Sequence, residues 1–395
     1  MPTGHERKSS LTLLSQSPAT AANSRRKRGD LRPLQRVPLL ILGFAGLVVG
    51  TGAGLARLGW DVPAATVAMV SLHGPLMVCG FFGVVIALER AVAIGRYWAY
   101  VGPFLAGAGC VAAIAGATAV ASGFFVAGSG VLLAASIDIF RRQTALFTFT
   151  LALGAACWLV GTVLWATGSA VHDLVAWWLA FLILTIAGER LELSRFLPPS
   201  PIARWVFAAI VGALVAGLLG AAWRWGAQIF AAGLVALAAW LVKQDIARRT
   251  VRAQGLTRYI AVCLLSGYAW LAIGGGIIVA ARGFHPGTAS YDAAVHALAL
   301  GFVFAMVFGH APIIVPAVAR VAVPYHWTFY LPLALLHASL VLRLAGDAVD
   351  GFALVRAGGL GNALALAAFI ASTASAVIRG RRRRASVAGP EVPRG

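Results

Sequence analysis

Long apolar stretches follow one another along almost the whole chain, separated by short polar or Gly- and Pro-containing segments. A membrane-spanning helix needs about 20 mostly apolar residues. Twelve stretches approach that length, near 38–58, 64–88, 99–118, 122–140, 145–167, 171–188, 202–222, 226–242, 258–281, 291–318, 328–344 and 352–378. A helix satisfies its backbone polar groups within its own segment, and strand-like alternation of polarity is missing from the sequence. The pattern therefore predicts an all-α, polytopic transmembrane bundle of about twelve helices.

Two stretches differ from the others in length. The one near 226–242 is short, and the one near 291–318 is long and contains Pro312 and Pro316. Proline removes a helical hydrogen bond and kinks or breaks a helix. We therefore expect the long stretch to kink or to end early.

The two ends of the chain differ in composition from the part between them. Residues 1–36 are rich in Ser, Thr, Ala and Arg, and the chain from 379 onward is basic and then contains Pro and Gly. Both ends lack apolar periodicity, so 1–36 and 379–395 are predicted to be disordered, with one transmembrane domain at 37–378. The basic cluster at 24–28 is interpreted as an orienting charge cluster rather than an export signal, and no cleavable signal peptide is expected.

The placement of the basic residues predicts the orientation of the bundle. Hydrophobic residues make up 60% of the chain and charged residues 11%, against roughly 25% charged in soluble proteins. A net charge of +19 is typical of nucleic-acid binding, but with the N-terminus inside, 27 of the 32 Lys and Arg fall on the inner side. Cytoplasmic loops of membrane proteins carry this excess. We therefore predict both termini in the cytoplasm, a plasma or inner membrane, contact with the lipid bilayer, and no nucleic-acid partner.

The four cysteines all lie inside apolar stretches, at Cys79, Cys110, Cys157 and Cys263. None pairs at CxxC spacing, so neither a disulfide framework nor a zinc site is indicated. We interpret them as buried small hydrophobic residues.

Ionisable residues are costly inside a bilayer and usually mark function. Six of the eight histidines lie in or beside the apolar stretches. His73, His172 and His296 occur on the second, sixth and tenth stretches, which all run from outside to inside. This spacing predicts histidines in the outer half or at its edge on every fourth helix. It suggests a repeat of four helices taken three times.

Further histidines lie at other depths. His296 and His310 are 14 residues apart, which in an α-helix is about 40° short of four turns and about 21 Å of rise. They would share one face of the tenth helix. His326 and His337 would share a face if their helix began early enough, which Pro332 makes doubtful. These positions predict more than one site.

Imidazole is a ligand for iron, copper and zinc, and axial histidines on facing helices can hold a heme within a bundle. Small residues follow both candidate axial ligands, His73 and His296, and would let a flat macrocycle approach. They are Gly74, Gly80, Gly83, Ala297, Ala299 and Gly301. The alternative is that such histidines hydrogen-bond a neighbouring helix and the small residues only pack.

Other polar residues carry two interpretations each. His310, His337 and His326 are candidates for a second metal site. Asp292 is a candidate acceptor that orients a histidine ring, or a first-turn acid that complements the helix dipole. The Glu-Arg pairs at 89–90 and 189–190 are either interfacial ion pairs or points of proton entry.

Twelve spans with a histidine on each of spans 2, 6 and 10 resemble the subunit I fold of heme-copper oxidases and nitric oxide reductases, which is built of three four-helix arcs. The resemblance implies that His73 and His296 hold a low-spin heme. The His-Ala-Leu-x-x-Gly sequence at His296 and the Gly-His at His310 also resemble the NnrS family of heme- and copper-containing membrane proteins. That likeness implies a link to nitric oxide stress and denitrification.

The chain departs from the oxidase pattern in three places. Span 7 has no histidine, the two histidines of span 10 are 14 residues apart instead of close together, and span 6 lacks the copper-site His with a nearby Tyr. These departures argue against a dioxygen-reducing centre. In the NnrS pattern the later Gly-His also lies farther from the first His.

The first hypothesis for function is therefore an integral membrane protein that binds heme, with copper as a second candidate, in nitrogen-oxide or redox metabolism. A redox partner or partner subunit would fit this role. A proton- or metal-coupled transporter is an alternative, although such a protein should show a two-half repeat and broken helices. A cofactor-free membrane scaffold or assembly factor is the third hypothesis, and enzyme, sensor and transporter remain open.

Overall fold

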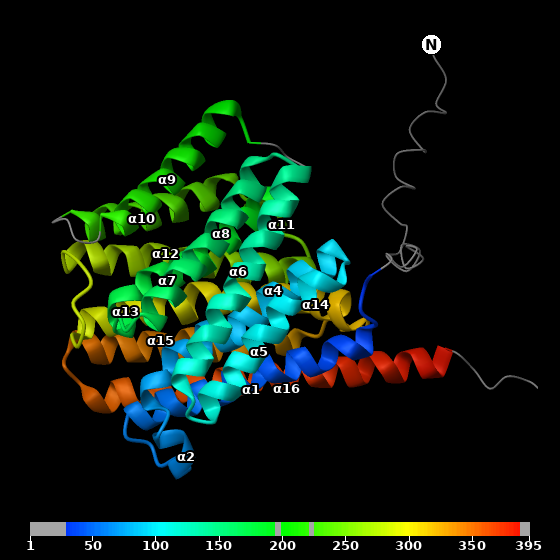
Figure 1. Cartoon of the computed structure of the whole chain (residues 1–395), viewed down its shortest axis with the longest axis horizontal. Coiled ribbons are helices and arrows are strands. Elements are labelled where there is room, and N and C mark those ends of the chain that lie inside the picture. Colours follow the sequence, from blue (N-terminus) through cyan, green and yellow to red (C-terminus); the bar gives the residue numbers. More distant parts are fainter. Residues whose placement is uncertain (1–28, 194–198, 221–224, 388–395) are drawn as a thin grey trace, which may run out of the picture.

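The computed structural model describes residues 29–193, 199–220 and 225–387. Within these ranges the chain is helical and contains no strand (Figure 1). Twelve helices are long and apolar enough to cross a membrane, so the protein is a multi-pass membrane protein. Numbered in chain order, spans 1 to 12 are Pro33–Arg57, Val70–Ile94, Tyr97–Ile114, Thr118–Arg142, Leu146–Ala166, Val171–Leu193, Pro201–Leu219, Gly226–Gln244, Gly255–Ala280, Ala289–Ala319, Trp327–Ala348 and Phe352–Arg382.

Eight spans are single helices and four are built from several segments. The single helices are α1 (Pro33–Arg57), α6 (Thr118–Arg142), α7 (Leu146–Ala166), α8 (Val171–Leu193), α9 (Pro201–Leu219), α10 (Gly226–Gln244), α12 (Gly255–Ala280) and α16 (Phe352–Val387). Span 2 combines η3 (Val70–Leu72), α3 (His73–Pro75), η4 (Leu76–Phe82) and α4 (Gly83–Ile94). Span 10 combines α13 (Ala289–His296), η7 (Ala297–Phe304) and α14 (Ala305–Ala319).

The remaining elements are short or begin a span. Span 3 consists of η5 (Tyr97–Tyr100) and α5 (Val101–Ile114), and span 11 of η8 (Trp327–Phe329) and α15 (Tyr330–Ala348). The four-residue helices α2 (Ala64–Val67) and α11 (Ala247–Thr250) lie between spans. The segments η4 and η7 are π-helical, a form that is uncommon and occurs frequently at functional sites.

Helix contacts bring spans 2, 6 and 10 together. Consecutive spans pack along the chain, and α16 packs against both α15 and α1, so that span 12 joins span 1. In addition α3 contacts α8, α8 contacts η7, and α4 contacts α14. The three spans that carry a histidine on every fourth helix in the sequence therefore contact one another.

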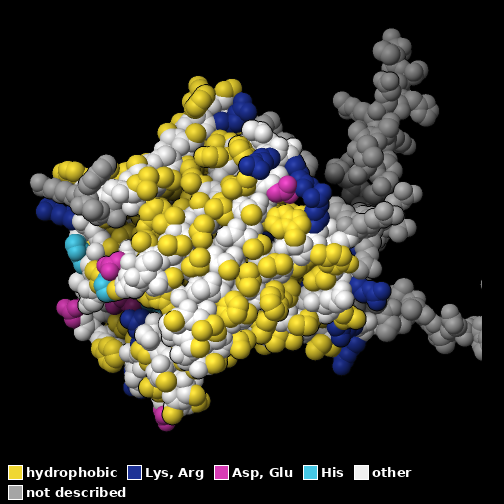
Figure 2. All heavy atoms as spheres, viewed as in Figure 1, with side chains coloured by type: hydrophobic (Ala, Val, Ile, Leu, Met, Phe, Trp, Pro, Cys, Tyr) yellow, Lys and Arg dark blue, Asp and Glu magenta, His cyan; other side chains and the backbone are white. Residues whose placement is uncertain are grey.

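The bundle has two polar ends separated by an apolar belt. The start of α1 and the end of α16 lie at the same end (Figure 1), which we call the terminal face, and the opposite end is the far face. Figure 2 shows hydrophobic side chains over the middle of the molecule and Lys and Arg gathered toward the terminal face. This distribution is that of a helical bundle surrounded by lipid, with spans 2, 6 and 10 running from the far face to the terminal face.

The prediction of twelve helical spans is confirmed, and two details are corrected. The second stretch does not begin at 64, because 64–67 form the separate helix α2; span 2 ends instead at Ile94, where Gly95 is left-handed with φ 67°. The tenth span does not end early, since α14 continues through Pro312 and Pro316 to Ala319. Prolines are tolerated in membrane helices where other groups satisfy the freed backbone atoms.

Both predicted disordered ends extend too far into the chain. Arg36 is 2% exposed, pairs with Asp30 at 2.8 Å, and donates to the Val318 carbonyl at 3.0 Å. The segment just before span 1 is thus held against the terminal face by contacts between residues distant in sequence, which periodicity does not reveal. At the other end α16 continues to Val387, so the helix includes basic residues beyond its apolar part. The predictions for 1–28 and 388–395 lie outside the described residues.

The four cysteines are free and buried, as the sequence predicts. Cys79 accepts a hydrogen bond from the indole nitrogen of Trp158 at 3.3 Å. Their role in the described structure is therefore packing.

Candidate functional site

Two histidines face one another between spans 2 and 10, near the far face. The ring centres of His73 and His296 lie 6.5 Å apart, and their planes differ by 20°. Both side chains are partly buried. The structure therefore brings together the two residues that the sequence predicts as axial ligands.

Each of these rings is held by its Nδ1 atom on a backbone carbonyl. His73 Nδ1 lies 2.7 Å from the Gly50 oxygen, and His296 Nδ1 lies 2.8 Å from the Asp292 oxygen. A carbonyl oxygen only accepts hydrogen bonds, so in both rings Nδ1 carries the proton and donates it. In the neutral ring Nε2 is then unprotonated and able to bind a metal. This is the arrangement that orients metal-ligating histidines in proteins.

Helix α1 is shaped to receive the His73 ring. A Cβ atom at Gly54 would lie 2.9 Å from both Cε1 and Nδ1 of His73. Real Cβ atoms do not tolerate so close an approach to a fixed ring, so the position requires glycine. Gly50 supplies the carbonyl one turn earlier, and the two glycines together fix the height and tilt of the imidazole.

On the other side, Asp292 and Arg343 support His296. The Asp292 carboxylate lies 3.3 Å from His296 Nδ1. It also accepts two hydrogen bonds from the Arg343 guanidinium, at 2.7 and 2.9 Å. Arg343 comes from α15 and its side chain is 8% exposed. Asp292 therefore contacts the His296 ring from the first turn of α13, which fits both interpretations of this residue.

The π-helical segments explain how each of spans 2 and 10 presents its histidine and a following phenylalanine on one face, toward the other span. Phe81 and Phe304 each follow their histidine by eight residues, and their rings stack 5.9 Å apart with planes 2° from parallel. Two α-helical turns take about 7.2 residues, so eight residues would carry the phenylalanine off the histidine face. A π turn accommodates about one more residue. With η4 and η7 present, each span places its phenylalanine on the same side as its histidine, toward the other span.

The distance between the ring centres of His73 and His296, 6.5 Å, is close to the distance between two imidazoles that bind one metal ion. A metal–imidazole bond is about 2 Å and the ring centre lies about 1 Å beyond the nitrogen, so two such ligands place their centres about 6 Å apart. Among the described residues no group of three or more His, Cys, Asp or Glu could hold a metal. A protein-bound zinc takes three or four protein ligands.

His310 belongs to a different site, in the terminal half of the bundle. Its Nδ1 donates to the Met306 carbonyl at 2.6 Å, and its Nε2 accepts from Arg190 at 3.3 Å. Arg190 also pairs with Asp245 at 2.8 Å, and Tyr268 donates to the same carboxylate at 2.5 Å. The side chains of Arg190 and Asp245 are 6% and 3% exposed, so this is a buried and internally neutralised network.

The Glu-Arg pairs of spans 2 and 6 lie next to this network. Glu189 interacts electrostatically with Glu89, Arg90 and Arg190. Spans 2 and 6 thus bring their two glutamates close to each other, as the matching sequence positions suggest. Neither interpretation of these pairs, interfacial ion pair or proton entry, is decided by this contact.

His337 and His326 do not join either site. His337 Nδ1 accepts from the indole nitrogen of Trp270 at 2.9 Å, and its Nε2 lies 3.0 Å from the Ser266 hydroxyl. Both nitrogens are therefore used by the protein. His326 precedes η8, where its Nδ1 caps Thr328, so it does not lie on the α15 helix with His337. The structure does not assemble His310, His326 and His337 into the expected second metal site.

The predicted common face of His296 and His310 also needs revision. That prediction assumed a continuous α-helix, whereas η7 occupies eight of the intervening residues. His296 faces His73 of span 2, and His310 bonds Arg190 of span 6. His172, at the start of α8, is 49% exposed and lies 3.6 Å from Asp173. The every-fourth-helix pattern thus marks a pair rather than a trio of facing rings.

Several residues of these sites were not singled out by the sequence. Each of them contacts a residue that is distant in the chain, which the sequence does not reveal. They are Gly54, Arg343, Asp245 and Tyr268. One signal was present: the spacing of eight residues between histidine and phenylalanine occurs in both span 2 and span 10. It could have predicted two similar spans that face each other.

Comparison with known protein families assigns the chain to a family whose function is unknown. The model of a domain of unknown function, DUF8744, matches residues 36–378, and the chain belongs to that family. The match covers the whole predicted transmembrane domain, 37–378. A search of curated proteins found no match. The resemblance to NnrS and heme-copper oxidase proteins stays a prediction.

Proposed function

We propose that this member of the DUF8744 family is an integral membrane heme-binding protein, with His73 and His296 as the axial ligands. The observation that supports this is the pair of facing imidazoles, 6.5 Å apart, each with Nδ1 on a carbonyl. Two protein ligands are what an iron porphyrin requires, because the macrocycle supplies the other four. Copper bound by the same pair is the second candidate, since imidazole also suits copper.

The surrounding residues have definite tasks under this proposal. Gly50 and Asp292 keep each Nδ1 protonated, so that Nε2 stays free for the metal. Gly54 leaves room for the His73 ring. The stacked rings of Phe81 and Phe304 fill the space between spans 2 and 10 on the terminal side of the pair. They would keep water away from the bound group. Exclusion of water is one of the factors that set the redox potential of such a centre.

A role in nitrogen-oxide or redox metabolism is the physiological part of the proposal. It rests on the resemblance of the sequence around His296 and His310 to the NnrS family. Addition of nitric oxide to the reduced, heme-loaded protein tests it. A changed visible spectrum would support a nitrogen-oxide role, and an unchanged spectrum would leave electron transfer as the supported function.

We also propose that the terminal face is cytoplasmic and that the membrane is the plasma or inner membrane. In the sequence, 27 of the 32 Lys and Arg belong to segments that the predicted topology assigns to the inner side, and such an excess marks the cytoplasmic side. The histidine pair then lies toward the outside. Labelling of single cysteines introduced at Ser169 and Arg381, with an impermeant reagent on intact cells, would establish which face is outside.

Visible absorption of the purified protein tests the heme assignment. The protein would be extracted in a neutral detergent, analysed for iron and copper, and titrated with hemin. We expect a Soret band at one heme per chain in the parent protein. His73→Ala and His296→Ala should each abolish the low-spin spectrum, because one axial ligand is lost.

Matched variants separate coordination from folding. His337→Ala and His310→Ala also remove a histidine from the bundle interior, but both nitrogens of each ring already have protein partners. These variants should keep the spectrum. A protein that retains native helicity and stays colourless after hemin titration, with no bound metal, would exclude the proposal.

A further inference from the structure

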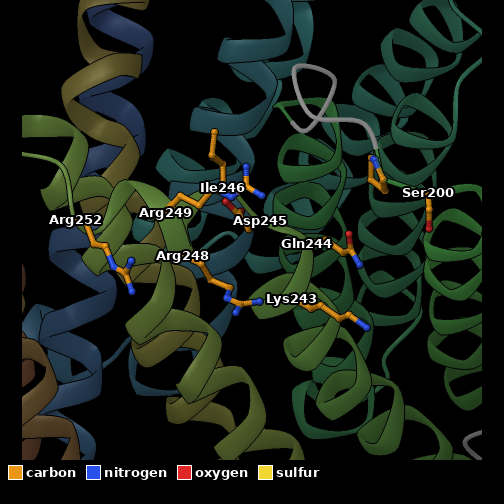
Figure 3. Close-up of a pocket in the computed structure, with 9 residues that line it drawn as sticks. Ser200, Lys243, Gln244, Asp245, Ile246, Arg248, Arg249 and Arg252 are labelled. Atoms are coloured by element: carbon orange, nitrogen blue, oxygen red, sulfur yellow. The ribbon is translucent and has the colours of Figure 1, made fainter.

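A basic pocket lies at the terminal face, outside the histidine sites. It has a volume of about 660 Å³ and is formed where α10 ends, at the α11 turn, and at the start of α9. Figure 3 shows the side chains around Asp245, with Ser200 contributed from the other side. Its charged lining residues are Lys243, Asp245, Arg248, Arg249 and Arg252.

The pocket carries an uncompensated positive charge. Lys243, Arg248, Arg249 and Arg252 are exposed, and none of their side chains makes a hydrogen bond or ion pair with another described residue. The one carboxylate in the lining, Asp245, is already neutralised, since it accepts from Arg190, from Tyr268 and from the Ala247 backbone nitrogen. Four cations therefore surround a hollow without an acidic partner, and the hollow favours a multivalent anion.

The surroundings of the pocket favour a lipid as the source of that anion. Ile202 and Trp205, on the first turns of α9, are 75% and 77% exposed. Tryptophan is enriched where a membrane protein meets the headgroup layer. Ile246, part of the pocket lining, is also 43% exposed. Apolar surface for acyl chains thus adjoins cations for a headgroup, at the end of the lipid-facing belt.

We propose that this pocket binds a phosphate group, and that the headgroup of an anionic phospholipid is its source. Basic pockets between membrane helices bind such headgroups, and each Lys or Arg near an anionic membrane surface attracts them. Arginine supplies planar, paired donors that match phosphate oxygens. Asp245 also lines the pocket, and its almost fully buried carboxylate holds Arg190 and, through it, His310.

Native mass spectrometry of the full chain in neutral detergent tests the proposal. Phosphatidylglycerol and phosphatidylcholine would be titrated separately, followed by competition with inorganic phosphate. We expect phosphatidylglycerol to bind at least tenfold more tightly than phosphatidylcholine. Weak competition by inorganic phosphate would identify the lipid as the source, and strong competition would identify free phosphate.

A matched pair of variants locates the binding. Arg248→Gln with Arg249→Gln removes two charges from the pocket, whereas Arg381→Gln with Arg382→Gln removes two exposed charges from α16 on the same face. The first pair should reduce the preference for phosphatidylglycerol at least tenfold, and the second should change it less than twofold. If the pocket pair folds poorly, Lys243→Gln replaces it, with an expected loss of at least threefold. Equal losses in both pairs, or no preference in the parent protein, would overturn the proposal.

Discussion

Span 10 carries two histidines that differ in how many of their ring nitrogens are bound by the protein. His296, near the far face, uses one ring nitrogen on a carbonyl and faces a second imidazole. His310, near the terminal face, uses both nitrogens, one on a carbonyl and one on a buried arginine. The first arrangement leaves a nitrogen for coordination, whereas the second completes a protein network. Burial of a histidine in a membrane is therefore less informative than the partners of its two nitrogens.

The two regions also neutralise their charges differently. In the terminal half, Arg190 and Asp245 are both almost fully buried, and further donors saturate the carboxylate. Near the far face, Arg343 is buried but Asp292 is 32% exposed. The terminal network thus depends on each of its members for stability. The far-face pair can lose a charge at lower cost, as expected where solvent still reaches the carboxylate.

The largest effect should come from breaking the buried pair. Arg190→Met leaves Asp245 as an unpaired buried charge, and the loss of one partner of such a pair costs about 3–5 kcal/mol. Arg343→Met should cost less than half as much, because water can solvate part of Asp292. Unfolding titrations in sodium dodecyl sulfate, followed by circular dichroism, would measure both free energies. Equal costs would mean that the two regions are not electrostatically distinct.

Removing a fully bonded histidine should affect stability without affecting the cofactor. His337→Ala leaves the Trp270 indole donor without its acceptor, and an unsatisfied buried donor costs roughly 1–3 kcal/mol. The same unfolding titration measures this loss. Loss of the heme spectrum in this variant would show that His337 contributes to binding, contrary to the distinction drawn from ring nitrogens.

A smaller and more specific effect is expected at Gly54. In Gly54→Ala the added methyl would lie 2.9 Å from the His73 ring, so the imidazole must move from its position on the Gly50 carbonyl. Disturbing a group that orients a metal ligand costs about 10–100-fold in affinity, and we expect about tenfold weaker hemin binding.

Gly276→Ala is the matched control for this change. Gly276 also lies within a span, but a Cβ atom there meets nothing within 4 Å. Hemin titration of the two variants should therefore differ, with Gly276→Ala close to the parent protein. Equal hemin affinities in the two variants would indicate that hemin binding does not depend on the position of the His73 ring against α1.

Much of the fold could be predicted because hydropathy depends on composition over about 20 residues. All twelve spans were located, including Gly226–Gln244, which the sequence predicts to be short but which has 19 residues, one more than span 3. The packed segment at 29–36 was not, because Arg36 is buried by Asp30 and by the Val318 carbonyl, 282 residues away. A single arginine in a polar segment gives no sign of such a partner. Likewise, the π-helical segments change no residue's hydropathy and leave no mark in the apolar pattern.

The sequence singled out two histidines that lie together in the structure, but it did not specify the local geometry around them. His73 and His296 were chosen from their regular occurrence along the spans, and the structure places them face to face. The partners of His337, Trp270 and Ser266, lie on a helix 67 or more residues away. Only the fold reveals that these bonds use both nitrogens. Asp292 was singled out because it lies near the outer end of span 10, and its position four residues before His296 is fixed by the sequence.

The paired π-helical segments have a consequence for the evolution of this family. Each segment adds the equivalent of one residue between a histidine and the phenylalanine eight positions later. A relative that lacks one residue in either interval would keep both rings on one face in a regular α-helix, because seven residues fall only about 20° short of two turns. An alignment gap there would thus indicate that a regular helix replaces the π-helical segment, and not that the pair is lost. Length in these two intervals is itself an inherited trait.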